Sequence, residues 1–211
     1  RGPWKEEERI GIVGLPCQVL ALAKMKTSKL EQKTAIDRVA LVIGLFCTWA
    51  LDYKPFAAFL YERVVNHPIK KLNITPPPER VLEVTAGNKL YRIPLDDIRA
   101  FIRPSCRVCL DMTAEISDIS VGTVEGKEGW NTVIVRTEKG EDLLKWAKNV
   151  GVIETRPLPK DNLNHLKEAS LLKKRRALIA LNETGGLEKG YFTLSANLIN
   201  RILSESEGIT T

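Results

Sequence analysis

The first third of the chain alternates short, continuously apolar segments with segments whose apolar residues recur at helical spacing. Arg9–Gly14 is a short apolar stretch that ends at glycine, and Gln18–Lys26 has the apolar spacing of a helix. Val39–Phe46 is almost continuously apolar, which is typical of a parallel strand covered on both faces. Asp52 is a candidate N-cap for a second helix, which Pro68 ends. This order of elements predicts an α/β fold with a small parallel core between residues 9 and 65.

The middle of the chain changes character and predicts an inserted β-hairpin, so that the fold becomes mixed α/β and α+β. Pro76–Pro78 is a stiff break, and Arg80–Leu95 alternates polar and apolar residues around Gly87-Asn88. We expect residues 1–187 to form one domain, and we assign no role to the tail 188–211. The other expected elements are strands at Asp118–Val124, Thr132–Thr137 and Val152–Arg156, a turn at Glu138–Gly140, and helices at Glu141–Asn149 and Asn162–Leu181.

Composition narrows the class of protein. The chain has 211 residues, of which 44% are apolar, enough for one good core or one core with a small appendage. No apolar run approaches the roughly 20 residues that a membrane-spanning helix needs, and the first residues lack the pattern of a signal peptide. We therefore expect a cytoplasmic protein with no direct membrane insertion.

The charge balance suits anionic partners: nucleic acid, a membrane surface or phosphorylated small molecules. There are 32 basic and 26 acidic residues, a net charge of +6, which suits phosphorylated ligands. The only dense basic run, Lys173–Arg176, lies inside a predicted helix, where a solvated face is the ordinary explanation. No zinc finger, basic zipper or RNA-binding aromatic signature accompanies it, so we expect no nucleic-acid partner.

The four cysteines are the main candidates for chemistry. Cys17 lies in the turn between a predicted strand and a predicted helix, and Cys47 ends the second predicted strand. Parallel pairing would place both at the same edge of the sheet. Cys106 and Cys109 form a C-x-x-C pair in a segment without regular periodicity. Ligands of one metal centre converge in this way from strand ends and loops.

The spacing of the cysteines leaves several explanations open. Structural disulfides are disfavoured because nothing indicates an oxidising compartment. Structural zinc often uses two C-x-x-C pairs, and only one is present. An iron–sulfur cluster takes four thiolates and accepts irregular spacing. Alternatively, Cys17 and Cys47 are small buried apolar residues and only the C-x-x-C pair binds metal. Spacing favours the iron–sulfur cluster slightly over zinc and does not settle the choice.

A glycine-rich segment follows the strand expected at Asp118–Val124. Its glycines permit close approach of the backbone to a phosphate or a flat ring, although turns between strands use glycine for geometry alone. It lacks the dinucleotide fingerprint G-x-G-x-x-G. Trp130 is able to stack on a ring, but a loop tryptophan is more often a packing anchor. The candidate binding residues are Ser120, Gly122, Gly126, Gly129, Trp130, Asn131 and Thr132.

Five blocks, in this order and at these rough spacings, resemble one known family. They are Gly14–Gln18, Gly44–Cys47, Cys106–Asp111, Asp118–Gly122 and Gly129–Val133. The sequence resembles the beta subunit of coenzyme F-420-reducing hydrogenase and its relatives, including the beta subunit of deazaflavin-dependent formate dehydrogenase. The resemblance runs from about Arg9 to about Ala177. The chain departs from the usual family pattern at Leu15, Thr48-Trp49, Met112 and Asn131.

The resemblance implies a set of cofactors and residues. Cys17, Cys47, Cys106 and Cys109 become the ligands of one [4Fe–4S] cluster, whose four sulfur atoms we expect to converge. The glycine-rich segment becomes part of an FAD site, against which coenzyme F-420 docks as substrate. Relatives carry roughly 100 residues, a domain's worth, before the first cysteine block, so we expect this chain to lack an N-terminal portion.

The resemblance also implies the activity: an oxidoreductase subunit that passes electrons between F-420, FAD and the cluster. No side chain need act as acid or base, so no catalytic residue is nominated. Gln18 is a candidate for hydrogen bonding to the cluster. The expected partners are other subunits of a redox complex, such as a hydrogenase or a formate dehydrogenase, and the Asn162–Leu181 helix with Lys173–Arg176 is a candidate docking surface. The alternatives are a non-enzymatic zinc- or cluster-bearing interaction subunit and a reductase that acts on another substrate.

Overall fold

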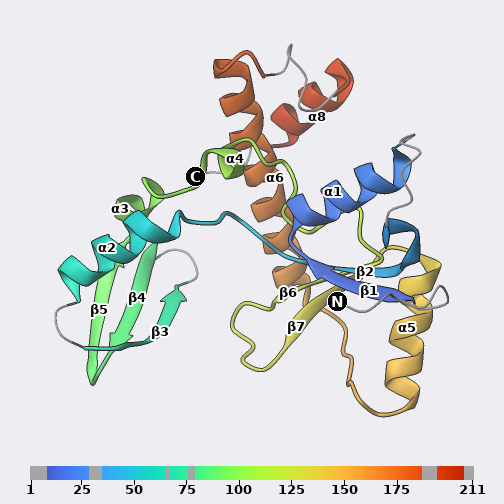
Figure 1. Ribbon diagram of the computed structural model, residues 1–211, viewed down its shortest axis with the longest axis horizontal. Helices are drawn as coiled ribbons and strands as arrows, with labels where there is room; N and C mark the ends of the chain where they lie inside the picture. Colours follow the sequence, from blue (N-terminus) through green and yellow to red (C-terminus); the bar gives the residue numbers. More distant parts are fainter. Residues whose placement is uncertain (1–8, 29–34, 65–66, 76–78, 187–193, 207–211) are drawn as a thin grey trace. The chain divides into compact units, whose positions relative to one another are not determined.

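The computed structural model describes residues 9–28, 35–64, 67–75, 79–186 and 194–206 (Figure 1). The proline break at Pro76–Pro78 lies outside the described residues. The chain divides into two compact units, one formed by Arg1–Thr48 with Val108–Thr211 and the other by Trp49–Arg107. Residues 1–187, expected as one domain, are thus distributed over both units, and each unit is described by itself.

The first unit is built on a four-stranded sheet. Its strands are β1 (Ile10–Gly14), β2 (Val39–Leu45), β6 (Ile119–Thr123) and β7 (Asn131–Val135), in the order β1-β2-β6-β7. β1 pairs with β2, and β2 with β6, in parallel, whereas β7 is antiparallel to β6. The predicted parallel core is therefore confirmed for the first two strands, with a third parallel strand from later in the sequence.

Helix α1 (Pro16–Thr27) covers one side of this sheet. It begins directly after β1 because Pro16 suits the first turn of a helix, where its missing N–H is not needed. Its apolar residues pack on β2 and on the 3₁₀ helix η1 (Ala35–Arg38). The residues of this core are Val19, Ile36, Val39, Val42 and Ala114, with Ile12 and Leu22 beside them.

Helix α5 (Glu138–Asn149) starts earlier than the sequence predicts. The expected turn at Glu138–Gly140 is wrong, because Thr137 caps a helix that includes these residues. The Thr137 Oγ1 atom accepts a hydrogen bond from the Gly140 N–H at 3.3 Å. The strand expected at Val152–Arg156 is also wrong, since these residues form no regular element and are exposed. Among the described residues, no strand pairs with this segment.

Two helices complete the first unit. Helix α6 (Lys160–Glu183) confirms the long helix expected at Asn162–Leu181, and Gly185, with φ at +65°, follows its end. Helix α8 (Ala196–Ser206) lies in the tail to which no role was assigned. It packs against α6 (Figure 1), and Ile202 is buried. The tail therefore contributes to the fold of this unit.

The second unit contains the predicted hairpin within a three-stranded antiparallel sheet. Its strands are β3 (Ile69–Ile74), β4 (Val81–Ala86) and β5 (Lys89–Pro94), and β3 was not expected. Two short helices, α3 (Leu95–Arg99) and α4 (Pro104–Arg107), follow β5.

Helix α2 (Tyr53–Arg63) also belongs to the second unit. Its assignment to the parallel core is wrong, because Leu60 and the adjacent Val64 share a hydrophobic core with Val84 of β4 and Ile98 of α3. Among the described residues, no helix has the length and apolarity needed to cross a bilayer.

Candidate functional site

Three parallel strands of the first unit end at one edge of its sheet. Gly14 of β1 lies opposite Gly44 of β2, and Gly44 lies opposite Ser120 of β6. Cys17 and Cys47 each follow one of the paired glycines by three residues. Both cysteines therefore lie just beyond the same edge, as parallel pairing predicts. The carboxyl end of parallel strands is where α/β sheets usually bind their ligands.

Cys17 is the second residue of α1 and its side chain is exposed. Gln18, expected to hydrogen-bond to the cluster, uses its side-chain oxygen for a local contact, and its amide N–H groups are not part of that contact. Its Oε1 atom accepts a hydrogen bond from the Leu15 N–H at 2.8 Å and so caps the helix.

Cys47 and Cys109 lie on two segments that one lysine joins. The Cys47 N–H donates to the Met112 carbonyl at 2.8 Å. The Nζ atom of Lys173 in α6 donates to the carbonyl oxygens of Cys47 and Asp111, each at 2.6 Å. The thiol of Cys109 donates to the same Asp111 oxygen at 3.5 Å. The end of β2 and the segment after the C-x-x-C pair are thus held against α6 at a single ammonium group.

Lys173 corrects the expectation of a solvated basic face. It is 4% exposed, so Lys173 itself is not part of a solvated face, whereas Arg176 of the same run is exposed. Lys174, next to it, pairs with Glu115 and reaches the Leu110 carbonyl at 3.4 Å. The sequence holds one signal of this role, because Lys173 precedes Ala177 by four residues and Leu181 by eight. All three share one buried face of α6.

Cys106 belongs to the second unit, whereas Cys109 belongs to the first. In its own unit Cys106 lies on α4, and its Sγ atom accepts a hydrogen bond from the Ala50 N–H at 3.4 Å. All four cysteines are reduced thiols. Within the part of the chain that the structure describes, no three His, Cys, Asp or Glu side chains are close enough to hold a metal ion. The donor chemistry of a thiolate-ligated centre is present, and the convergence of all four sulfur atoms stays a prediction.

The glycines of the candidate flavin segment differ in what their missing side chain permits: close packing at one position, and positive φ values at two others. A Cβ atom at Gly122 would lie 1.9 Å from the ring of Phe46, so this glycine is required by packing against the residue before Cys47. Gly126 and Gly129 have φ values of +69° and +78°, and a Cβ at either would meet nothing within 4 Å. The segment thus begins beside Cys47 and then forms a turn with open space over its backbone.

The side chains proposed to bind the flavin fall into two groups. Trp130 is partly exposed, with the Arg156 guanidinium 4.6 Å from its ring centroid, and Asn131 is exposed. Ser120 and Thr132 are buried. The Ser120 hydroxyl accepts a hydrogen bond from Arg136 Nε at 2.8 Å and donates to the Ala114 carbonyl at 3.2 Å. This hydroxyl is therefore engaged inside the protein.

Helix α6 also anchors the turn after β6. The Asn162 side chain donates to the Glu125 carbonyl at 3.0 Å, and His165 Nδ1 lies 2.5 Å from Glu125 Oε2. His165 precedes Lys173 by eight residues, which places both on one face of the helix. One element therefore contacts both the glycine-rich segment and two of the cysteine segments.

Comparison with known proteins identifies the family. Residues 7–161 match the family described as the C terminus of the coenzyme F420 hydrogenase/dehydrogenase beta subunit. This match covers most of the chain, including all four cysteines and the glycine-rich segment. The chain belongs to this family. The resemblance carried by the five sequence blocks is thereby confirmed, and the α/β fold agrees with that of a family member of known structure.

Two relatives named for coenzyme F420 are each 30% identical to the chain over the aligned region. It is 30% identical over 190 residues to coenzyme F420 hydrogenase subunit beta of Methanothermobacter thermautotrophicus, covering 87% of this chain and 66% of the relative. It is 30% identical over 165 residues to the coenzyme F420-dependent sulfite reductase of Methanocaldococcus jannaschii, covering 70% of this chain and 26% of that protein.

A solved structure shows the same fold. A chain of the F420-reducing [NiFe] hydrogenase complex from Methanosarcina barkeri superposes with a TM-score of 0.75 at 27% identity, covering 83% of this chain and 61% of that one. The chain thus spans about two thirds or less of the length of the curated relatives that it matches.

Proposed function

We propose that this chain is the iron–sulfur and flavin-binding region of an oxidoreductase subunit that exchanges electrons with coenzyme F420. The observation that carries the proposal is the parallel register of Gly14, Gly44 and Ser120. Because of this register, Cys17, Cys47 and the glycine-rich turn all leave the sheet at one edge, where a cluster and a flavin would lie near each other. The names of the relatives support the substrate class.

In this proposal Cys17, Cys47, Cys106 and Cys109 hold one [4Fe–4S] cluster. The set consists of four reduced thiols, which suits iron–sulfur ligation. Backbone N–H groups of Cys47 and Cys106 are already held by internal hydrogen bonds, which orients the segments before any cofactor binds.

The turn after β6 forms part of the FAD site in the same proposal. Gly126 and Gly129 leave the backbone open to close approach, Trp130 offers a flat wall, and Asn131 offers an exposed amide. Ser120, Gly122 and Thr132 would support the turn without contacting FAD. Ser120 and Thr132 are buried in the strands on either side of the turn, and Gly122 leaves room for the ring of Phe46. Bound FAD would supply the conversion between hydride transfer and single-electron transfer that links F420 to an iron–sulfur cluster.

The partners in this proposal are other subunits of a redox complex. The relatives are named as subunits of an F420 hydrogenase and of an F(420)H(2) dehydrogenase, and one is an F420-dependent sulfite reductase. The present chain would exchange electrons with F420 and pass them to or from a partner, which is a hydrogenase, a formate dehydrogenase or another reductase. The cysteine edge of the sheet would pass electrons to a carrier in that partner.

The test is anaerobic preparation of the protein, followed by measurement of iron, sulfide, zinc and flavin per chain. We expect one [4Fe–4S] cluster with broad visible absorbance that dithionite bleaches, and bound FAD that reduced F420 bleaches. Zinc without sulfide would overturn the proposal in favour of a zinc-bearing interaction subunit. Bleaching by dithionite but not by reduced F420 would point to a reductase with another electron donor.

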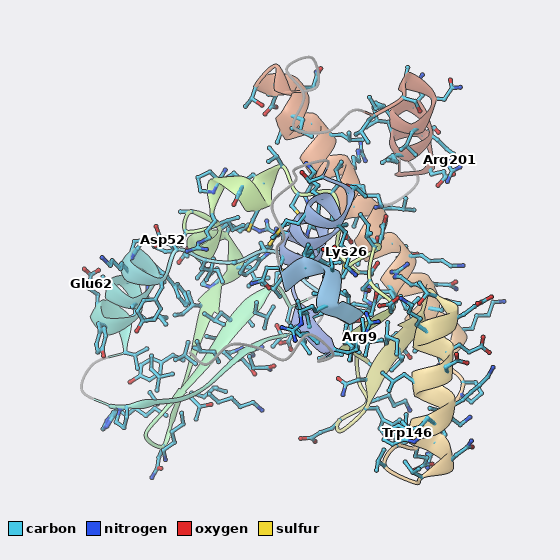
Figure 2. All side chains as sticks on the ribbon, turned by 45° about the vertical axis from the view of Figure 1, so that its right-hand side comes forward. Arg9, Lys26, Asp52, Glu62, Trp146 and Arg201 are labelled. Carbon is cyan, nitrogen blue, oxygen red and sulfur yellow. The ribbon has the colours of Figure 1, made fainter. Side chains whose placement is uncertain are left out.

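Replacing Trp130 by alanine is expected to weaken FAD binding about fivefold without changing iron content, because loss of a stacking wall removes about 1 kcal/mol. Fluorescence titration of FAD measures this change. Trp146→Ala is the matched control, since this tryptophan, labelled on α5 in Figure 2, is 59% exposed and distant in sequence from the turn. Equal FAD affinity in wild type and Trp130→Ala would remove the turn from the flavin site.

A further inference from the structure

A buried cation lies beside the cysteine segments of the first unit. Lys173 is 4% exposed, and its ammonium group donates to two backbone carbonyls, those of Cys47 and Asp111. Carbonyl oxygens satisfy hydrogen bonds but carry only partial charge. The full positive charge of this side chain is therefore held in a protein interior at the point where two cysteine segments meet.

The described residues provide no carboxylate within ion-pair distance of Lys173. The nearby carboxylate of Asp111 accepts hydrogen bonds from the N–H groups of Thr113 and Glu115, at 3.0 and 2.9 Å. The carboxylate of Glu115 pairs with Lys174 instead. Of two adjacent lysines on α6, the less buried one thus has an acidic partner and the more buried one has only carbonyls.

An ion held in the interior without an opposite charge costs several kcal/mol. Each of the two segments that Lys173 joins carries a thiol, Cys47 on one and Cys109 on the other. Cys109 Sγ and Lys173 Nζ contact the same Asp111 oxygen, at 3.5 and 2.6 Å, so they lie no farther apart than the sum of these distances. Cys47 is bound to the same ammonium through its own carbonyl. A thiolate-ligated cluster carries net negative charge, which is opposite to the charge of the buried Lys173 ammonium group.

We propose that Lys173 is a positioning residue that serves as the counter-charge of the cysteine centre, and this rests on the cluster assigned under the proposed function. Its two hydrogen bonds set the distance between the Cys47 and Cys109 segments. Its charge stabilises the negative charge of the bound centre, and stabilises the reduced form more than the oxidised form because the reduced form is more negative.

The experiment compares Lys173→Met with Lys173→Arg in the anaerobically prepared protein. Methionine keeps an unbranched side chain and removes the charge, whereas arginine keeps the charge. We expect Lys173→Met to lose at least half of its iron per chain and to shift the midpoint potential of the remaining centre to more negative values. Lys173→Arg should recover part of both. Lys167→Met, at an exposed position of the same helix, should match the wild type.

Two results would overturn the inference. One is a folded Lys173→Met protein with the iron content and midpoint potential of the wild type. The other is a Lys173→Arg protein with the same losses as Lys173→Met, which would make the effect one of packing and not of charge. A wild type without iron would instead refute the proposed function itself, so the two failures are distinguishable.

A measurement on the wild type serves where Lys173→Met is insoluble. Acylation of lysines by an amine-reactive reagent, followed by mass spectrometry, reports the accessibility of each ammonium group. We expect labelling of Lys173 to increase at least threefold when a chelator removes the iron, because the buried charge loses its counter-ion. Labelling of Lys167 should not change. Equal labelling of Lys173 before and after iron removal would contradict its role as counter-charge.

Discussion

Replacement of Cys109 by serine is expected to remove most of the bound iron while the protein stays folded. Serine is nearly the same size but is a poor ligand for an iron–sulfur cluster. The thiol donates a hydrogen bond to the Asp111 carbonyl, and a hydroxyl is able to replace it there. Cys109 lies outside both hydrophobic cores, so the free energy of unfolding should change by less than about 1 kcal/mol.

Iron and sulfide analysis together with circular dichroism would check this expectation. Ser105→Ala is the matched control, because Ser105 is exposed on α4 next to the C-x-x-C pair and is not a ligand in the proposal. Electron transfer to a partner should slow in Cys109→Ser in proportion to the iron lost. Full iron content in a folded Cys109→Ser protein would exclude Cys109 from the ligand set.

The substitution Gly44→Ala is expected to destabilise the protein by about 3 kcal/mol, the scale of overpacking in a rigid core. A Cβ atom at this position would lie 2.2 Å from the Cβ of Ala114 and 2.9 Å from the Ser117 hydroxyl. Ala114 is fully buried and has a φ of +54°, so its backbone has little freedom to move. The added methyl group must push β2 away from the segment that follows the C-x-x-C pair.

Denaturant unfolding of Gly44→Ala and Gly11→Ala would test this expectation. Gly11 lies in β1 of the same sheet, and a Cβ there would meet nothing within 4 Å. Gly11→Ala should therefore be neutral or stabilising by about 0.5 kcal/mol, through the reduced freedom of the unfolded chain. Equal stability of the two variants would show that the contact between Gly44 and Ala114 is not maintained in solution.

Elements whose residues interact mainly with their neighbours in sequence were predictable. β1, α1 and β2 follow from the alternation of apolar strand and amphipathic helix, and the hairpin around Gly87 follows from its turn residues. The strand β3 and the first residue of α5 were not predicted. β3 has no buried residue and forms because β4 offers it a pairing edge, and α5 begins at Glu138 because Thr137 supplies a cap that a turn would also use.

The candidate site divides in the same way. The sequence by itself determined the candidate residues, which are four cysteines and a glycine-rich segment, and its five blocks were specific enough to indicate the family. It also predicted that Cys17 and Cys47 lie just beyond the same edge of a parallel sheet, because the apolar runs and the glycines indicate where each strand ends.

Tertiary structure alone decided which of these residues face inward and what holds them. Ser120 is buried because Arg136, which follows β7, covers its hydroxyl, and α2 belongs to the second unit because its apolar face meets β4. Lys173 lies 126 residues from Cys47 in sequence and bonds to its carbonyl oxygen. From the sequence around it alone, a lysine within a basic run of a helix indicates a solvated surface. Its burial arises only when α6 packs against two segments that are remote along the chain, because burial depends on what the fold places opposite a side chain.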